Sequence, residues 1–147
     1  MLNPRTLATL VFILSMPVPA TADPASVAGN WTTIDEKGRA GSVIAISVVG
    51  GVAEGTVTKI YKRPGDTGFC AKCRGDLKDK PLVGMKILTN LKPDGEVWDG
   101  GAILDPGSGD TYDVRMRPLD GGRKLQVRGF LGISLLGRTQ VWVREGL

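Results

Sequence analysis

Residues 42–61 read SVIAISVVGGVAEGTVTKIY, and this stretch decides the fold class. Residues 42–49 are mostly apolar and β-branched, and residues 52–61 alternate in polarity, which is the pattern of two β-strands. Gly50 and Gly51 separate them, and glycine accepts the positive φ angles of tight turns between strands. The stretch therefore predicts an antiparallel pair of strands.

The same alternation recurs along the rest of the chain. It predicts about eight short strands, at residues 29–34, 42–49, 52–61, 82–91, 97–104, 111–117, 124–130 and 139–144. Residues 82–91 also have the composition of a helix, but Pro81, Gly84 and Pro93 argue against one. Residues 62–81 form a long polar loop. The expected fold class is all-β.

Most of the predicted connections are short, as in a meander of antiparallel neighbours. Closure of such a meander into an up-and-down barrel removes the exposed edges of the sheet. We therefore expect the last strand to pair with the first.

The first residues have the three parts of a secretory signal peptide. Arg5 gives a positive start, residues 7–16 are mostly apolar, and Ala20-Thr21-Ala22 forms a small-x-small cleavage site. A membrane anchor is the alternative, but spanning requires roughly 20 apolar residues. We expect a signal peptide at residues 1–22 and one domain at residues 23–147, in a periplasmic or secreted protein.

The composition weakens several classes of function. The chain has 147 residues and a formal charge of +4, which is too small for the strongly basic surface of a nucleic-acid binder. It has no histidine, so a Ser-His-Asp triad is impossible. The nearest candidates for acid–base chemistry are Asp99, Asp105, Asp110 and Asp113, whose spacing is that of turn residues. We expect a non-enzyme without a cofactor, and the oligomeric state is open.

Cys70 and Cys73 are the two cysteines of the chain, and they admit three interpretations. An oxidising compartment favours a structural disulfide. A redox couple normally opens a helix, whereas these flanks have the composition of a loop. A zinc site needs four ligands, which only Asp66, Asp76 or Asp79 could complete.

Around the cysteines, residues 59–80 carry an excess of lysine and arginine. The simpler interpretation is a solvated loop. The alternative is a surface that meets anionic head groups or sugars, since local positive potential attracts such partners. A peripheral contact with the cell envelope through this basic loop is therefore one possible interaction.

Several segments together resemble a known bacterial secreted family, domain of unknown function 2147. They are GNWTT at residues 29–33, CAKC at 70–73, KPLVGMKIL at 80–88, WDGGAILDPGSGDTY at 98–112, LQVRGFLG at 125–132 and GRTQVWVR at 137–144. The family name implies no function. The motif Gly29-Asn30-Trp31 is also similar to the opening motif of lipocalin-like barrels, in which an arginine of the last strand covers the tryptophan. This resemblance implies a cation on Trp31. Because Trp31 lies early in the first strand, we expect Arg144, late in the last strand, with Arg138 as the alternative if the register differs.

A barrel of eight strands is just wide enough to be filled by side chains or to hold one small ligand. Aromatic side chains are few and several glycines fall within strands, so we expect an apolar pocket. Its candidate lining residues are Trp31, Val57, Met85, Ile87, Ile103, Val114, Met116 and Val127. The expected function is binding of a small apolar molecule or a role at the envelope. The alternatives are a filled barrel acting through its loops, or thiol redox or metal binding.

Overall fold

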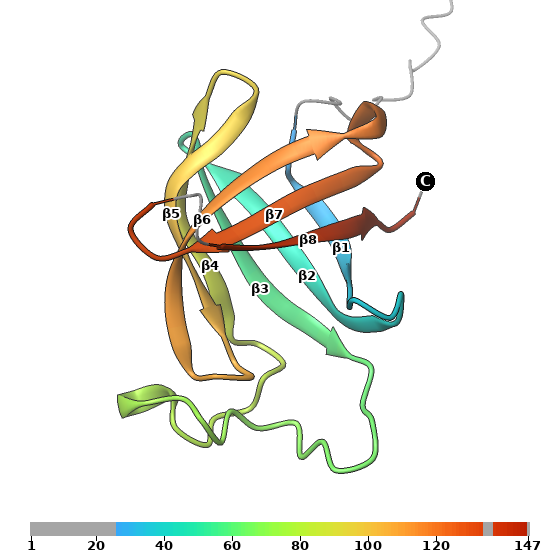
Figure 1. The fold of residues 1–147 in the computed structure, drawn as a ribbon, viewed down its shortest axis with the longest axis vertical. Helices are drawn as coiled ribbons and strands as arrows, with labels where there is room; N and C mark the ends of the chain where they lie inside the picture. Colours follow the sequence, from blue (N-terminus) through green and yellow to red (C-terminus); the bar gives the residue numbers. More distant parts are fainter. Residues whose placement is uncertain (1–25, 134–136, 147) are drawn as a thin grey trace, which may run out of the picture.

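A computed structural model describes residues 26–133 and 137–146, which form a closed barrel of antiparallel strands (Figure 1). The strands are β1 (Gly29–Ile34), β2 (Ala40–Val49), β3 (Val52–Ile60), β4 (Lys86–Asp94), β5 (Val97–Asp105), β6 (Asp110–Leu119), β7 (Lys124–Phe130) and β8 (Gly137–Arg144). Two 3-10 turns, η1 (Gly75–Leu77) and η2 (Asp120–Gly122), interrupt the loops. The all-β, lipocalin-like barrel is confirmed. The predicted signal peptide, residues 1–22, lies outside the described residues.

Each strand pairs with its neighbours in sequence, and β8 closes the barrel on β1. In this last pair Trp31 lies opposite Arg144 and Thr32 lies opposite Val143. The closure removes both sheet edges that an open meander would expose. Among the described residues, no helix is long and apolar enough to cross a membrane.

One predicted strand differs from the structure. Residues 82–85 form a turn before β4, in which the Met85 amide donates a hydrogen bond of 3.0 Å to the Leu82 carbonyl. Gly84 adopts a φ angle of 92°, which lies outside the range of regular β-strand backbone. At its other end β4 runs past residue 91, and Pro93 pairs with Trp98 of β5. Apolar composition therefore placed this strand about four residues too early.

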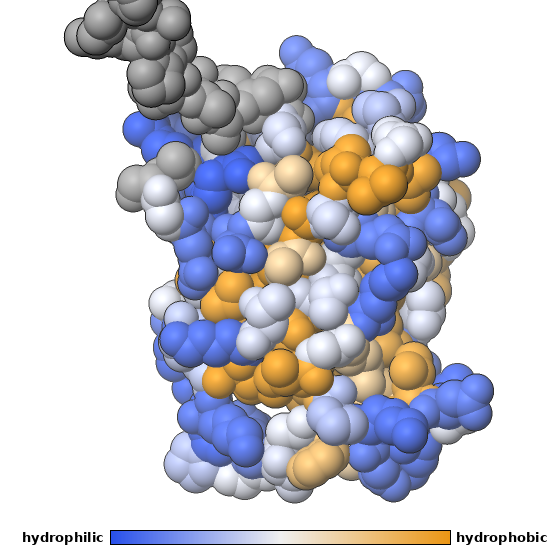
Figure 2. All heavy atoms as spheres, turned by 180° about the vertical axis from the view of Figure 1, so that it is seen from behind, coloured by the Kyte–Doolittle hydropathy of each residue, from blue (hydrophilic) through white to orange (hydrophobic). Residues whose placement is uncertain are grey.

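The two ends of the barrel differ. At one, which we call the closed end, β1 begins, β8 ends and Arg144 covers Trp31. The other, which we call the open end, is formed by residues 61–85, by the β1–β2 and β5–β6 connections and by residues 131–133 after β7. The long loop between β3 and β4 lies at the bottom of Figure 1. From behind, this lower edge carries mostly hydrophilic residues (Figure 2).

Large apolar side chains fill the interior away from the open end. Those with no or almost no exposed surface include Trp31, Ile44, Leu88, Leu91, Met116 and Leu125. Glycines make room for two of them: a Cβ atom on Gly55 would lie 2.8 Å from Leu88 Cδ1, and one on Gly101 would lie 2.6 Å from Leu91 Cγ. The strand glycines thus allow leucines to fill this half of the barrel.

Candidate ligand pocket

A pocket of about 370 Å³ opens at the open end of the barrel. This volume lies in the lower part of the range of small-molecule sites. All strands except β3 contribute to its lining, from Thr33 on β1 to Trp142 on β8. The packed interior lies beyond it, toward the closed end, so the pocket occupies one half of the barrel only.

One side of the pocket, the apolar wall, consists of side chains from β4 to β8. They are Ile87, Ile103, Leu104, Val127, Phe130 and Trp142. Tyr112 adds an aromatic ring and Asp105 adds a carboxylate at the edge. That carboxylate accepts hydrogen bonds from the Gly107 amide, at 2.8 Å, and from the Ser108 hydroxyl, so it belongs to the β5–β6 turn.

The other side, the polar wall, consists of Thr33, Ser42, Arg138 and Gln140. These residues come from β1, β2 and β8, which are adjacent strands in the closed barrel. Side chains two apart in a strand share a face, so Arg138 and Gln140 continue the inward row of buried Trp142. Thr33 likewise follows buried Trp31. The polar wall is thus the inward face of these strands near the open end.

Hydrogen bonds order the polar wall. The Ser42 amide donates to Thr33 Oγ1 at 2.9 Å, and the two hydroxyl oxygens lie 3.1 Å apart. Trp142 Nε1 donates to Gln140 Oε1 at 3.1 Å. This bond fixes the Gln140 amide so that its NH₂ group points away from the indole and remains able to donate.

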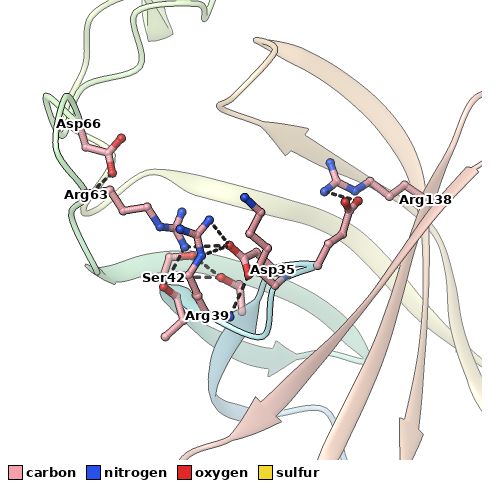
Figure 3. Close-up of polar contacts among 10 residues, drawn as sticks. Asp35, Arg39, Ser42, Arg63, Asp66 and Arg138 are labelled. Atoms are coloured by element: carbon pink, nitrogen blue, oxygen red, sulfur yellow. Dashed lines mark hydrogen bonds and ion pairs between the residues drawn. The ribbon is translucent and has the colours of Figure 1, made fainter.

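An ionic cluster at the β1–β2 turn lies beside the pocket (Figure 3). Asp35 accepts hydrogen bonds from the Arg39 amide at 2.8 Å and the Lys37 amide at 2.9 Å, and from the guanidinium groups of Arg39 and Arg63. The Arg39 amide is the largest cause that lowers the pKa of Asp35 to about 2, followed by the Arg39 side chain and the Lys37 amide; partial burial opposes them. Asp35 therefore stays ionised and holds both arginines.

Arg138 has a different partner. Its guanidinium lies 3.0 Å from the carboxylate of Glu36, on the same turn (Figure 3). The side chain of Glu36 is 81% exposed and that of Arg138 is 62% exposed. Ion pairs between such exposed groups contribute little free energy. Arg138 is thus a pocket residue whose present ion pair is easily exchanged.

The cysteines form the predicted disulfide, with Cα atoms 5.3 Å apart. Both side chains are buried, and the loop that carries them rests on the β5–β6 turn. A Cβ atom on Gly109 would lie 1.9 Å from the Lys72 carbonyl oxygen, so the two backbones touch. Arg74 adds an ion pair of 2.9 Å with Asp110. The disulfide thus shapes a loop that is docked onto the barrel beside the pocket.

A second hollow, of about 610 Å³, lies between this loop and the barrel. Arg74 and Leu77 line it, and it shares Leu104, Tyr112 and Leu131 with the pocket. The Arg74–Asp110 ion pair belongs to its lining. No group of three or more cysteine or acidic residues in residues 26–133 and 137–146 is arranged to hold a metal ion.

The structure distributes the candidate pocket residues over two regions. Ile87, Ile103 and Val127 line the pocket. Trp31, Val57, Met85, Val114 and Met116 lie in the packed core instead. None of these five side chains lines the pocket. In the deeper interior, Gly55 and Gly101 admit the side chains of Leu88 and Leu91, which occupy the space that the glycines leave. Sequence reasoning missed the polar wall, for which the available signal was polar residues on the inward face of the last strand.

The acidic candidates have structural partners. Asp99 binds the guanidinium of Arg115, with Nε at 2.8 Å, and accepts from the Gly100 amide. Burial pushes the pKa of Asp99 upward, but these bonds outweigh it and hold the pKa below its ordinary value. Asp105 belongs to a turn and Asp110 to the ion pair with Arg74. The backbone of Asp113 pairs with Phe130 across β6 and β7, and its side chain is exposed.

Comparison with known proteins supports the architecture. No curated protein matches the sequence. Among solved structures, the chain is similar to protein HP1028 from Helicobacter pylori, described as belonging to the lipocalin family. The two share 17% identity at a TM-score of 0.70, over 82% of this chain and 84% of the other. This similarity establishes the fold.

The sequence also matches a family profile over residues 29–144, from the first residue of β1 to the last residue of β8. The matched region includes every strand, the disulfide loop and the residues of both pocket walls. The chain therefore belongs to the family DUF2147, described as uncharacterized protein conserved in bacteria.

Proposed function

We propose that this protein binds a small, largely apolar molecule in the pocket at the open end of the barrel. The observation that carries the proposal is the apolar wall, which lines one side of a pocket of about 370 Å³ next to the filled core. Apolar surface removed from water there contributes roughly 25 cal/mol per Å² before the costs of association are subtracted. The lipocalin-like architecture supports the same function.

Trp142 provides the test, because its ring lines the pocket while Trp31 lies at the closed end. Titration with 1-dodecanol should change the tryptophan fluorescence in a saturable way. Trp142→Phe should abolish most of that change, and Trp98→Phe, outside the pocket lining, should preserve it. Absence of saturable binding below roughly 1 mM, equivalent to about −4 kcal/mol, in both fluorescence and calorimetry contradicts the proposal.

We also propose that the protein works in the periplasm or after secretion. The support is the signal-peptide pattern of residues 1–22 together with a disulfide, which persists in oxidising compartments. The mass of the protein isolated from an envelope extract should correspond to a chain that begins at Asp23. Retention of Met1 in that fraction contradicts cleavage.

A second candidate function is contact with the envelope through residues 59–80. Phe69 and Val83 expose about half of their surface beside this lysine-rich loop. Apolar tips among basic side chains suit an anionic lipid surface. Vesicles containing phosphatidylglycerol should sediment the protein, and vesicles of phosphatidylcholine alone should not. Equal sedimentation with both, or with neither, contradicts this function.

A further inference from the structure

We propose that the ligand is an amphiphile with an anionic head group, and that Arg138 binds this group at the polar wall. The inference rests on the proposed function and specifies the chemical class of the ligand. It starts from the division of the pocket, whose apolar side chains come mainly from β4 to β7 and whose polar side chains come from β8, β1 and β2. Such a division matches a molecule with one apolar part and one polar part.

The polar wall offers hydrogen-bond donors. Arg138 presents guanidinium N–H groups, and the Gln140 amide, held by Trp142 through its oxygen, presents its NH₂ group. Thr33 Oγ1 already accepts the Ser42 amide. When the Thr33 hydroxyl donates to Ser42 Oγ, the Ser42 hydroxyl is left to donate into the pocket. Donors of this kind, with one positive charge among them, select a carboxylate or a phosphate-type oxygen.

Arg138 can change its ion-pair partner more easily than Arg39 and Arg63, the two arginines of the ionic cluster at the β1–β2 turn. Arg39 and Arg63 are both bound to Asp35, which the amides of the turn keep ionised. Arg138 is bound to Glu36, which is exposed and which, within residues 26–133 and 137–146, binds no other residue of the pocket lining. A ligand carboxylate would replace one exposed ion pair with another that is less exposed to water. The shift toward lower dielectric strengthens the new pair.

Glu36 has a defined role in this scheme. Its carboxylate pairs with the guanidinium of Arg138 while the pocket is empty, and it moves into solvent when the head group of the ligand binds. Glu36 therefore competes with the ligand. Its removal should strengthen binding of an anionic ligand and leave binding of a neutral ligand unchanged.

Three probes with the same alkyl chain test the inference: dodecanoate, 1-dodecanol and dodecylammonium. We expect the full mature chain to bind dodecanoate at least about tenfold more tightly than 1-dodecanol at neutral pH and low salt, and dodecylammonium most weakly. Calorimetry measures all three, below the critical micelle concentrations of the two ionic probes and below the solubility limit of 1-dodecanol. Equal affinity for dodecanoate and 1-dodecanol contradicts the proposal of an anionic head group, but it is consistent with the proposed apolar pocket. Absence of binding by all three overturns the pocket itself.

The variants assign the preference to Arg138. Arg138→Gln should remove the preference for dodecanoate without lowering the affinity for 1-dodecanol. Arg138→Lys should retain part of the preference. Glu36→Gln should raise the affinity for dodecanoate about two- to fivefold. The matched control is Arg115→Gln, which removes an ion-paired arginine outside the pocket lining and should change neither affinity. An unchanged preference in Arg138→Gln overturns the assignment.

Discussion

The Cζ atom of Arg144 lies 4.2 Å from the centroid of the Trp31 ring, so the last strand places a cation on the indole of the first. The same guanidinium donates hydrogen bonds to the carbonyls of Ser26, Ala28 and Gly122, at 2.6–2.7 Å. Burial lowers the pKa of Arg144 from its ordinary value. One side chain thereby joins the residues before β1, the η2 turn and β8 at the closed end.

Arg144→Met should lower the free energy of unfolding by about 2–4 kcal/mol, because it leaves carbonyl groups without their charged donor and removes the cation–π contact. Urea denaturation of the mature chain measures the loss. The control is Arg138→Met, whose exposed ion pair predicts a change within about 1 kcal/mol. Similar losses in the two variants would contradict the structural role of Arg144.

Gly109→Ala should separate the disulfide loop from the β5–β6 turn. The new Cβ would meet the Lys72 carbonyl oxygen, and the φ angle of 78° adds backbone strain. Gly95→Ala is the matched control, since its φ angle is 60° and a Cβ there meets nothing within 4 Å. We expect a loss of about 1–2 kcal/mol for Gly95→Ala and about 1–3 kcal/mol more for Gly109→Ala. Equal losses in urea denaturation would show that the loop does not rest on Gly109.

Removal of the disulfide by Cys70→Ser/Cys73→Ser should cost about 1–2 kcal/mol, since the closed ring is short and the chain-entropy contribution is correspondingly small. The barrel should remain folded, and trypsin should cut the double variant faster within residues 62–85, where lysines and arginines are frequent. Reduction of the wild-type protein should give the same cleavage pattern. An unaltered rate of cleavage would mean that the loop holds its shape without the bond.

Asp35 should make stability depend on acid pH. Its folded pKa is about 2 and its ordinary value is 3.8, so its contribution is present above about pH 4 and is lost as the pH falls toward 2. Asp35→Asn should therefore lower the urea midpoint at pH 7, and the difference from wild type should shrink at pH 2. Asp94→Asn, exposed at the β4–β5 turn, is the control and should show no such dependence. A difference of the same size at both pH values would exclude the titration of Asp35.

Alternation in polarity was enough to predict the barrel because each strand has one face toward the core. The strand predicted at residues 124–130 has the same bounds as β7 in the structure. The strand predicted at residues 82–91 began too early because Leu82 and Val83 have the composition of a strand, while the φ angle of Gly84 is a property of the folded loop. Composition describes a segment and gives no direct information on the backbone angles at one glycine.

The pocket was harder to predict for a related reason. Arg138, Gln140 and Trp142 alternate visibly along the sequence, but the polar wall arises only when β8 lies between β7 and β1. The deep interior was expected to be open because its glycines lack side chains. Leu88 and Leu91 occupy that space from other strands, and such contacts depend on the register of pairing rather than on any one segment.

The hydrogen bonds from Arg144 to Ala28 and Ser26 join residues separated by 116 and 118 positions. Contacts between residues so distant in sequence form late in folding, because the closure of a long loop precedes any gain from them. During synthesis, β1 therefore remains an unpaired edge on one side until β8 has emerged. The barrel acquires its complete set of strand pairs only when nearly the whole polypeptide is available, so the order of translation itself delays the native state.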